Sequence, residues 1–82
     1  MGNLNGKVAV VTGGGRDIGR AISVKLAQEG AKVVVNSHSS EAGANETVAE
    51  IEALGSEAIA VKADVSNLDD IKRLKEETLA AF

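Results

Sequence analysis

Short apolar runs rich in β-branched residues alternate along this chain with longer segments whose apolar positions recur at helical spacing. The apolar runs cover residues 7–12, 32–36 and 58–63, and their valine and isoleucine content predicts buried strands. Helices are predicted over residues 17–29, in the segment that ends at Gly55, and in the last part of the chain. This order of strand and helix predicts a parallel sheet with right-handed crossovers.

Each predicted helix carries apolar positions that recur at helical spacing along one side. The stripes are Ile18, Ile22 and the Lys25–Leu26 pair; Ala44, Val48, Ile51 and Leu54; and Leu68, Ile71, Leu74, Thr78 and Phe82. At the start of the third helix, Ser66 and Asp69 have the spacing of a capping box.

The handedness of the crossovers fixes where the helices lie. With the strands laid in the order 3-2-1, the first two helices cover one face of the sheet and the third lies on the other. The free side of strand one would then expose the most apolar strand, which a soluble monomer must cover. We therefore expect residues 1–82 to form one βαβαβα half of a single doubly wound α/β domain.

Composition limits the class of protein. The 82 residues suffice for one small domain, and 44% of them are hydrophobic and 26% charged. The absence of cysteine excludes disulfides and thiolate metal sites, and the net charge of -3 argues against a nucleic-acid surface. Because no apolar run approaches the roughly 20 residues of a membrane span and no signal-peptide pattern is present, we expect a soluble cytoplasmic protein.

The candidate chemistry lies in residues 8–21, VAVVTGGGRDIGRA, which predict a strand, a glycine-rich turn and a helix. The glycines permit a backbone path that other residues resist, and the helix that follows begins with free backbone N–H groups. Such a helix start favours an anion, most often a phosphate.

Two common phosphate motifs do not fit this turn. A P-loop read from Gly14 has Gly19 in place, but Arg20 and Ala21 replace the lysine and the hydroxyl residue that the motif needs. The GxGxxG fingerprint read from the first glycine of the turn has Ile18 where its third glycine should stand. The spacing of the remaining glycines has to be explained by another motif.

The segment from Thr12 to Gly19, TGGGRDIG, resembles the cofactor motif TGxxxGxG of the short-chain dehydrogenase/reductase family. The segments GKVAVVTGG, GRAI and LAQEGAKVVV, and the DV pair after the third strand, also resemble the N-terminal half of that family. They look closest to the 3-oxoacyl-(acyl-carrier-protein) reductases. The resemblance implies a Rossmann fold, a nicotinamide dinucleotide, and hydride transfer between NADPH and a carbonyl such as a 3-oxoacyl thioester.

Asp17 departs from the family motif, because it stands where the middle glycine is expected. It is either a helix-start residue that points to solvent or a carboxylate that weakens the pyrophosphate site, with Arg16 and Arg20 offsetting its charge. By resemblance, Gly13 allows the tight turn and Gly19 allows close packing or close approach of the cofactor.

The choice between NAD and NADP depends on the segment after the second strand, where an acidic residue would bind the adenosine ribose and repel a 2′-phosphate. This segment contains no carboxylate before Glu41 and reads Asn36, Ser37, His38, Ser39 and Ser40. By resemblance, Ser37 stands where NAD-preferring members carry aspartate, and Arg16 stands where many NADP-preferring members carry a basic residue. Both features predict NADP rather than NAD.

Two further features complete the predicted site. His38 is either an ordinary surface residue or a contact of the adenosine phosphate, and by resemblance Asp64 and Val65 contact the adenine ring. Asp64 can equally be a simple turn residue. The predicted cofactor-binding residues are Gly13, Gly15, Arg16, Asp17, Ile18, Gly19, Asn36, Ser37, His38, Ser39, Asp64 and Val65; no metal site is predicted.

The chain contains no tyrosine, the residue that donates the proton in this family with the help of a lysine and a serine. We therefore assign no catalytic residue and expect no reductase activity from these residues alone. Two hypotheses remain. The chain is the N-terminal part of an NADP-dependent reductase, completed by the remainder of its own chain, or it is a nucleotide-binding or structural module that self-associates through its first strand.

Overall fold

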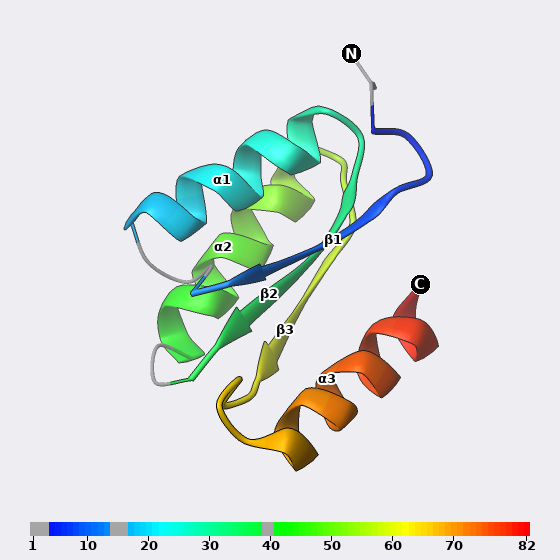
Figure 1. Ribbon diagram of the computed structural model, residues 1–82. Helices are drawn as coiled ribbons and strands as arrows, with labels where there is room; N and C mark the ends of the chain where they lie inside the picture. The colour runs from blue at the N-terminus through cyan, green and yellow to red at the C-terminus, as the bar shows by residue number, and fades with distance from the viewer. Residues whose placement is uncertain (1–3, 14–16, 39–40) are drawn as a thin grey trace.

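The computed structural model describes residues 4–13, 17–38 and 41–82, and it contains three strands and three helices in strict alternation (Figure 1). The elements are β1 Val8–Thr12, α1 Asp17–Gln28, β2 Lys32–Ser37, α2 Glu41–Ala53, β3 Ala58–Lys62 and α3 Leu68–Ala81. The predicted element order is confirmed, and the predicted strand ends differ by a single residue.

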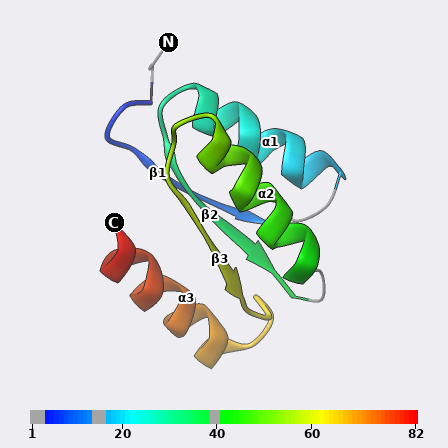
Figure 2. The same ribbon diagram turned by 180° about the vertical axis from the view of Figure 1, so that it is seen from behind.

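The strands form one parallel sheet in the order β1-β2-β3, so β2 is central. The register places Thr12 beside Asn36 and Ser37 beside Lys62, which aligns the carboxyl ends of neighbouring strands. Helices α1 and α2 cover one face of the sheet and α3 lies on the other, as both views show (Figures 1 and 2). The predicted strand order and helix placement are therefore confirmed.

The two faces of the sheet have separate apolar clusters. The cluster beneath α1 and α2 contains Val11, Ala27, Val33, Val35, Ala44, Ile51 and Ala58. The cluster on the α3 side contains Val34, Val61, Ala63 and Leu74. Because β2 supplies residues to both clusters, it is buried on both faces, which explains its unbroken run of valines.

Strand β1 is covered on one face only. Val11 points into the cluster beneath α1 and α2, whereas Val8 and Val10 are 43% and 45% exposed. These two side chains alternate with Val11 along the strand, so they lie on the face that α3 covers incompletely. The expectation that strand one would expose apolar surface is confirmed.

Of the apolar positions that recur at helical spacing in α1, Leu26 packs against the cluster beneath α1 and α2, but the two isoleucines do not. Ile18 and Ile22 are 77% and 47% exposed, while Ser23 and Ala27 are buried. The Ser23 hydroxyl donates a hydrogen bond to the Gly19 carbonyl at 2.8 Å, which satisfies it inside the helix. Small side chains let α1 lie close to its neighbours, and the larger isoleucines point away from that contact.

The predicted stripe of α3 is buried only in part. Leu74 is its buried residue, whereas Leu68 and Ile71 are 65% and 42% exposed. Ile51 of α2 is fully buried, whereas Leu54, which follows the end of that helix, is 49% exposed. Among the helices of the described ranges, none is long and apolar enough to cross a membrane.

The predicted capping box at the start of α3 is also wrong, because Asn67 is the N-cap. Its Oδ1 accepts hydrogen bonds from the backbone N–H groups of Asp69 and Asp70 at 2.9 and 3.2 Å. An asparagine in this position satisfies two helix-start donors at once. Ser66 is thereby free for a different contact, to Asp64.

Candidate functional site

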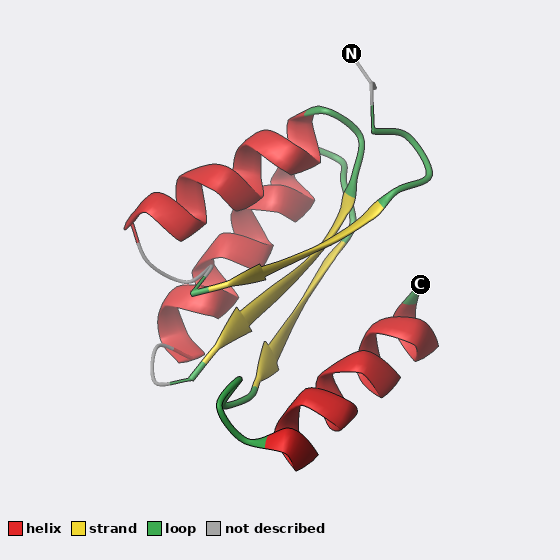
Figure 3. Ribbon diagram, in the orientation of Figure 1, coloured by secondary structure: helices red, strands yellow, loops and turns green. Residues whose placement is uncertain are grey.

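The carboxyl ends of all three strands meet at one edge of the sheet, toward which the strand arrowheads point in Figure 3. Gly13 follows β1 at this edge, His38 follows β2, and Asp64 lies two residues beyond β3. Ligands of open parallel α/β sheets bind outside such carboxyl ends. The described part of the predicted site is therefore gathered at a single edge.

The turn after β1 begins with a backbone conformation that favours glycine. Gly13 has φ of +69°, and a Cβ placed on it would have open space within 4 Å, so the requirement comes from the backbone alone. Helix α1 then begins at Asp17, and its first N–H groups lie at this edge. Ile18 is the exposed apolar residue beside them.

Part of the predicted site lies outside the described residues. Gly15, Arg16 and Ser39 belong to this part, and Asp17 is described as the first residue of α1. Gly19 lies in the first turn of the same helix, where its carbonyl accepts the Ser23 hydrogen bond.

Asn36 joins β2 to β3 through its side chain. It is 2% exposed, and its Nδ2 donates hydrogen bonds to the carbonyls of Val61 and Ala63 at 3.2 Å each. Both amide hydrogens are thus used inside the protein. Ser37 is similarly buried, and its carbonyl accepts a hydrogen bond from the Ala63 N–H at 2.9 Å. These two predicted site residues hold the edge together beneath its surface.

Asp64 is fixed by contacts on both sides. Its Oδ1 accepts hydrogen bonds from the Ser66 hydroxyl at 2.6 Å and the Ser66 N–H at 2.9 Å. Its Oδ2 lies 3.7 Å from Nε2 of His38. The hydrogen bonds from Ser66, with a smaller contribution from His38, lower the pKa of the Asp64 carboxyl below its ordinary 3.8. At neutral pH the edge therefore carries an ionised acceptor.

Two residues that support this loop were missed in the sequence. Asp70 accepts a hydrogen bond from the Asp64 N–H at 2.8 Å, and Arg73 donates through Nη2 to the Lys62 carbonyl. The sequence signal for Asp70 was an acidic residue in the first turn of a helix, but this feature is common to many helices and does not indicate a contact with a particular loop. Val65, next to Asp64, is 46% exposed and adds apolar surface at the edge.

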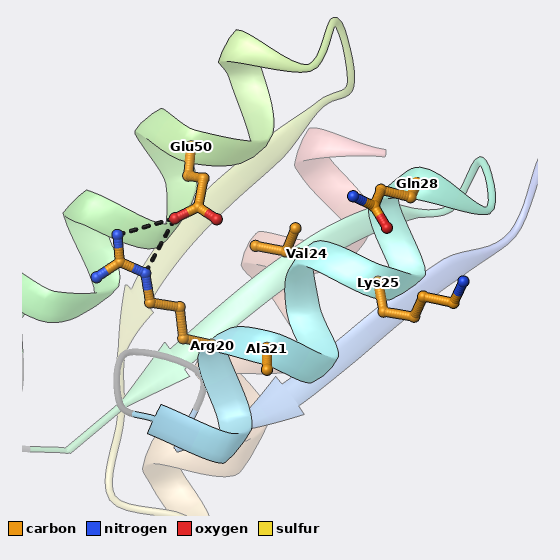
Figure 4. A pocket seen from close by; sticks show the side chains of 6 residues that line it. All are labelled: Arg20, Ala21, Val24, Lys25, Gln28 and Glu50. Atoms are coloured by element: carbon orange, nitrogen blue, oxygen red, sulfur yellow. Dashed lines mark hydrogen bonds and ion pairs between the residues drawn. The ribbon is translucent and has the colours of Figure 1, made fainter.

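Arg20 on α1 pairs with a glutamate of the neighbouring helix. Its Nε and Nη2 donate to Oε1 of Glu50 on α2, at 3.1 and 2.9 Å (Figure 4). The pair borders a depression of about 380 Å³ on the outer surface of α1 and α2, which Val24 and Gln28 also line. Arg20 thus joins α1 to α2 through this ion pair. Within the described ranges, no group of three metal-ligating side chains converges.

Known proteins resemble this chain closely. Hydroxynaphthalene reductase-like protein Arp2 of Metarhizium guizhouense is 51% identical over 80 residues, which cover 98% of this chain and 30% of that protein. A short chain dehydrogenase of Burkholderia cenocepacia, solved in complex with NADP, matches with a TM-score of 0.89 and 42% identity, over 95% of this chain and 32% of its own. The promiscuous reductase LugOII, which catalyses keto-reduction at C1 during lugdunomycin biosynthesis, matches with a TM-score of 0.83 and 50% identity, over 90% of this chain and 30% of its own.

The chain spans about 30% of the length of the curated relatives it matches. The family described as short chain dehydrogenase matches residues 7–82, which include every described element and the whole carboxyl edge. The parallel sheet, the glycine turn after β1 and the DV pair after β3 agree with this match. The chain therefore belongs to the short chain dehydrogenase family, whose members are oxidoreductases that bind a nicotinamide dinucleotide.

Proposed function

We propose that this chain binds the adenosine and pyrophosphate part of NADP(H) in an oxidoreductase that transfers hydride between NADPH and a carbonyl substrate. The observation that supports the proposal is that Gly13, His38 and Asp64 follow the three strands at the carboxyl edge of a parallel sheet. The NADP complex of the Burkholderia relative supports the choice of ligand class. Bound NADPH would supply the hydride.

The described residues fit such a ligand. The start of α1 after Gly13 offers backbone N–H groups to a pyrophosphate, and Gly13 adopts the positive φ of a tight turn. Asp64 is an ionised acceptor for the adenine amino group, and exposed Val65 offers apolar contact to the ring. Asn36 and Ser37 hold β2 against β3 beneath the ligand.

The preference for NADP rests on charge. The position that an acidic ribose-binding residue would occupy is Ser37, and the next residue is His38, whose side chain is 70% exposed. A 2′-phosphate therefore meets no carboxylate from β2. We place Arg16 beside that phosphate from its position in the family motif, as a charge-assisted partner.

The substrate proposal is a ketone. The name of the Metarhizium relative and the keto-reduction by LugOII favour a ketone on a naphthalene-like ring system. A 3-oxoacyl thioester, to which the sequence resemblance points, is the competing substrate. Because this chain contains no tyrosine, the proton donor has to come from outside these 82 residues, and we expect them to reduce neither substrate alone.

The cofactor proposal is tested by measuring the dissociation constants of NADPH and NADH by calorimetric titration. NADPH is expected to bind more tightly by about tenfold, because a charge-assisted hydrogen bond contributes about 1.5 to 3 kcal/mol and solvent screening reduces it here. Arg16→Ala should reduce the difference in affinity between NADPH and NADH. The matched control is Arg20→Ala, which removes an arginine already paired with Glu50 and should leave that difference unchanged. Equal affinities for both cofactors would refute the preference for NADP.

One observation favours a second candidate, a module that associates with a copy of itself. Val8 and Val10 are half exposed on an edge strand, and Val10 joins Ile71 and Leu79 in a largely apolar groove of about 260 Å³. Such a strand edge and groove favour association. Light scattering on the purified chain tests it, with Val10→Lys expected to give monomers. A wild-type protein that is monomeric at high concentration would exclude this candidate.

A further inference from the structure

Asp64 and His38 come from different strands and meet at the carboxyl edge. His38 follows β2, Asp64 follows β3, and the register that pairs Ser37 with Lys62 brings the two loops side by side. The atoms that face each other are Nε2 of His38 and Oδ2 of Asp64, 3.7 Å apart. The pair therefore links the two loops that would hold the adenosine.

The two oxygens of Asp64 have different roles. Oδ1 accepts both hydrogen bonds from Ser66, which fix the carboxylate, while Oδ2 faces the imidazole. The main chain of Asp64 is fixed as well, because its N–H donates to Oδ2 of Asp70. Because the Asp64 carboxylate is already fixed, it can orient the His38 ring without losing further conformational entropy of its own.

The side chain of His38 is more exposed than that of its partner Asp64. Its side chain is 70% exposed, whereas that of Asp64 is 37% exposed. Among the described charged groups near it, Asp64 faces the ring, Asp70 is taken by the Asp64 N–H, and Lys62 is exposed at the end of β3. A neutral imidazole has a single N–H donor. If the Nε2–H of His38 points at Asp64, the ring can donate from Nδ1 to a second anion only when it carries both hydrogens and is positively charged.

We propose that Asp64 is a positioning residue for His38, and that it orients the imidazole so that the ring can donate to the 2′-phosphate of NADP(H). This inference rests on the proposed function, and it gives Asp64 a role beyond the adenine contact. The two roles are separable because adenine is common to NAD and NADP, whereas the 2′-phosphate is not. Losing the adenine contact weakens both cofactors equally, and losing the orientation of His38 weakens only the phosphorylated one.

Two small nucleotides isolate the relevant group. Adenosine 2′,5′-bisphosphate and adenosine 5′-monophosphate differ only in the 2′-phosphate, and both fit the adenosine half of the site. Calorimetry gives the ratio of their dissociation constants for the wild type, His38→Gln, Asp64→Asn and the double variant. We expect His38→Gln to lower the preference for the bisphosphate about fivefold, and Asp64→Asn to lower it about two- to fivefold, as for an exposed charge pair.

The double variant completes the cycle. Because Asp64 acts through His38, the double variant should have the same preference as His38→Gln alone. Asp69→Asn is the matched control, since it removes an aspartate charge in the first turn of α3 and should leave the preference unchanged. Circular dichroism verifies that each variant is folded.

A measurement on the unmodified protein guards against a variant that fails to fold. The imidazole NMR signals of His38, the single histidine, should shift further on addition of the bisphosphate than on addition of the monophosphate, whose adenine alone lies near the ring. If the wild type prefers neither nucleotide, the proposed preference for NADP fails. If the wild type prefers the bisphosphate but Asp64→Asn weakens both nucleotides equally, or the ring signals do not respond, the positioning role alone is wrong.

Discussion

Replacing Asn36 by leucine removes the side-chain hydrogen bonds that join β2 to β3 while keeping a side chain of similar size. The amide donates to the Val61 and Ala63 carbonyls at 3.2 Å each, and all three residues are 2% exposed. A leucine in the same place leaves two buried carbonyls without this donor. The substitution therefore tests whether the register at the carboxyl edge depends on one polar side chain.

The magnitude follows from these contacts. Each buried acceptor that loses its partner costs about 1 to 3 kcal/mol, so two of them cost about 2 to 6 kcal/mol. The buried leucine returns about 1.5 to 3 kcal/mol through its apolar surface. The net loss is about 2 kcal/mol, out of the roughly 4 to 12 kcal/mol that a domain of this length has in total. The melting temperature should then fall by about 8 to 16 °C.

Urea unfolding of the purified chain, followed by circular dichroism, measures this loss. The matched control is Asn45→Leu, the same substitution at an exposed position of α2, and it should change the unfolding free energy by less than about 0.5 kcal/mol. If Asn36→Leu behaves like this control, the two hydrogen bonds do not hold the edge, and the reasoning is refuted.

Three further changes test other contacts. In urea unfolding, Gly30→Ala should destabilise the chain by more than the roughly 1 kcal/mol expected for Gly55→Ala. Both glycines have positive φ, but only at Gly30 would the new Cβ also lie 3.2 Å from the Asn5 backbone nitrogen, a contact that rotation of the Asn5 side chain does not relieve; equal losses would exclude that contact. In acid titration, Asp64→Asn should make stability less sensitive to pH below about 4: the lowered pKa of Asp64 stabilises the folded state above 3.8, and this stabilisation is lost as the pH falls through the folded value. If the unfolding free energy of Asp64→Asn falls with pH as steeply as that of the wild type, this contribution of Asp64 is excluded. Arg20→Gln should cost less than about 1 kcal/mol, and the cost should vanish in molar salt, since its ion pair is solvent-exposed.

The strands and their order were predictable because each depends on a local signal and a general rule. The valines of β2 mark a strand buried on both faces, and the handedness of crossovers places the helices. The buried face of α1 was not predictable from periodicity. Apolar spacing selected Ile18 and Ile22, but close packing selected the small side chains of Ser23 and Ala27. Size at a helix contact is a tertiary property, and a one-dimensional pattern does not contain it.

In the candidate site, too, the sequence indicated some residues but not the contacts that they make. Gly13 and Asp64 could be found in the sequence because each follows a recognisable strand end. The partners of Asp64 could not, because the His38 contact depends on the register between β2 and β3. Asn36 illustrates the limit further, since its acceptors lie 25 and 27 residues away in the chain. Its position suggested a ligand contact, whereas its hydrogen bonds join two strands.

Strand β1 connects the two proposed functions without making them exclusive. Its carboxyl end leads into Gly13 at the cofactor edge, while the apolar surface of Val8 and Val10 lies on the face toward α3. Every described contact that shapes the edge involves β2, β3 or the loop before α3, and none involves that exposed face of β1. A partner that covers Val8 and Val10 would therefore stabilise the sheet and leave the adenosine contacts in place. We therefore predict that Val10→Lys, which places a charge in the apolar groove beside α3, abolishes association through β1 and leaves the affinity for NADPH unchanged in calorimetry; a loss of affinity would show that the two properties are coupled.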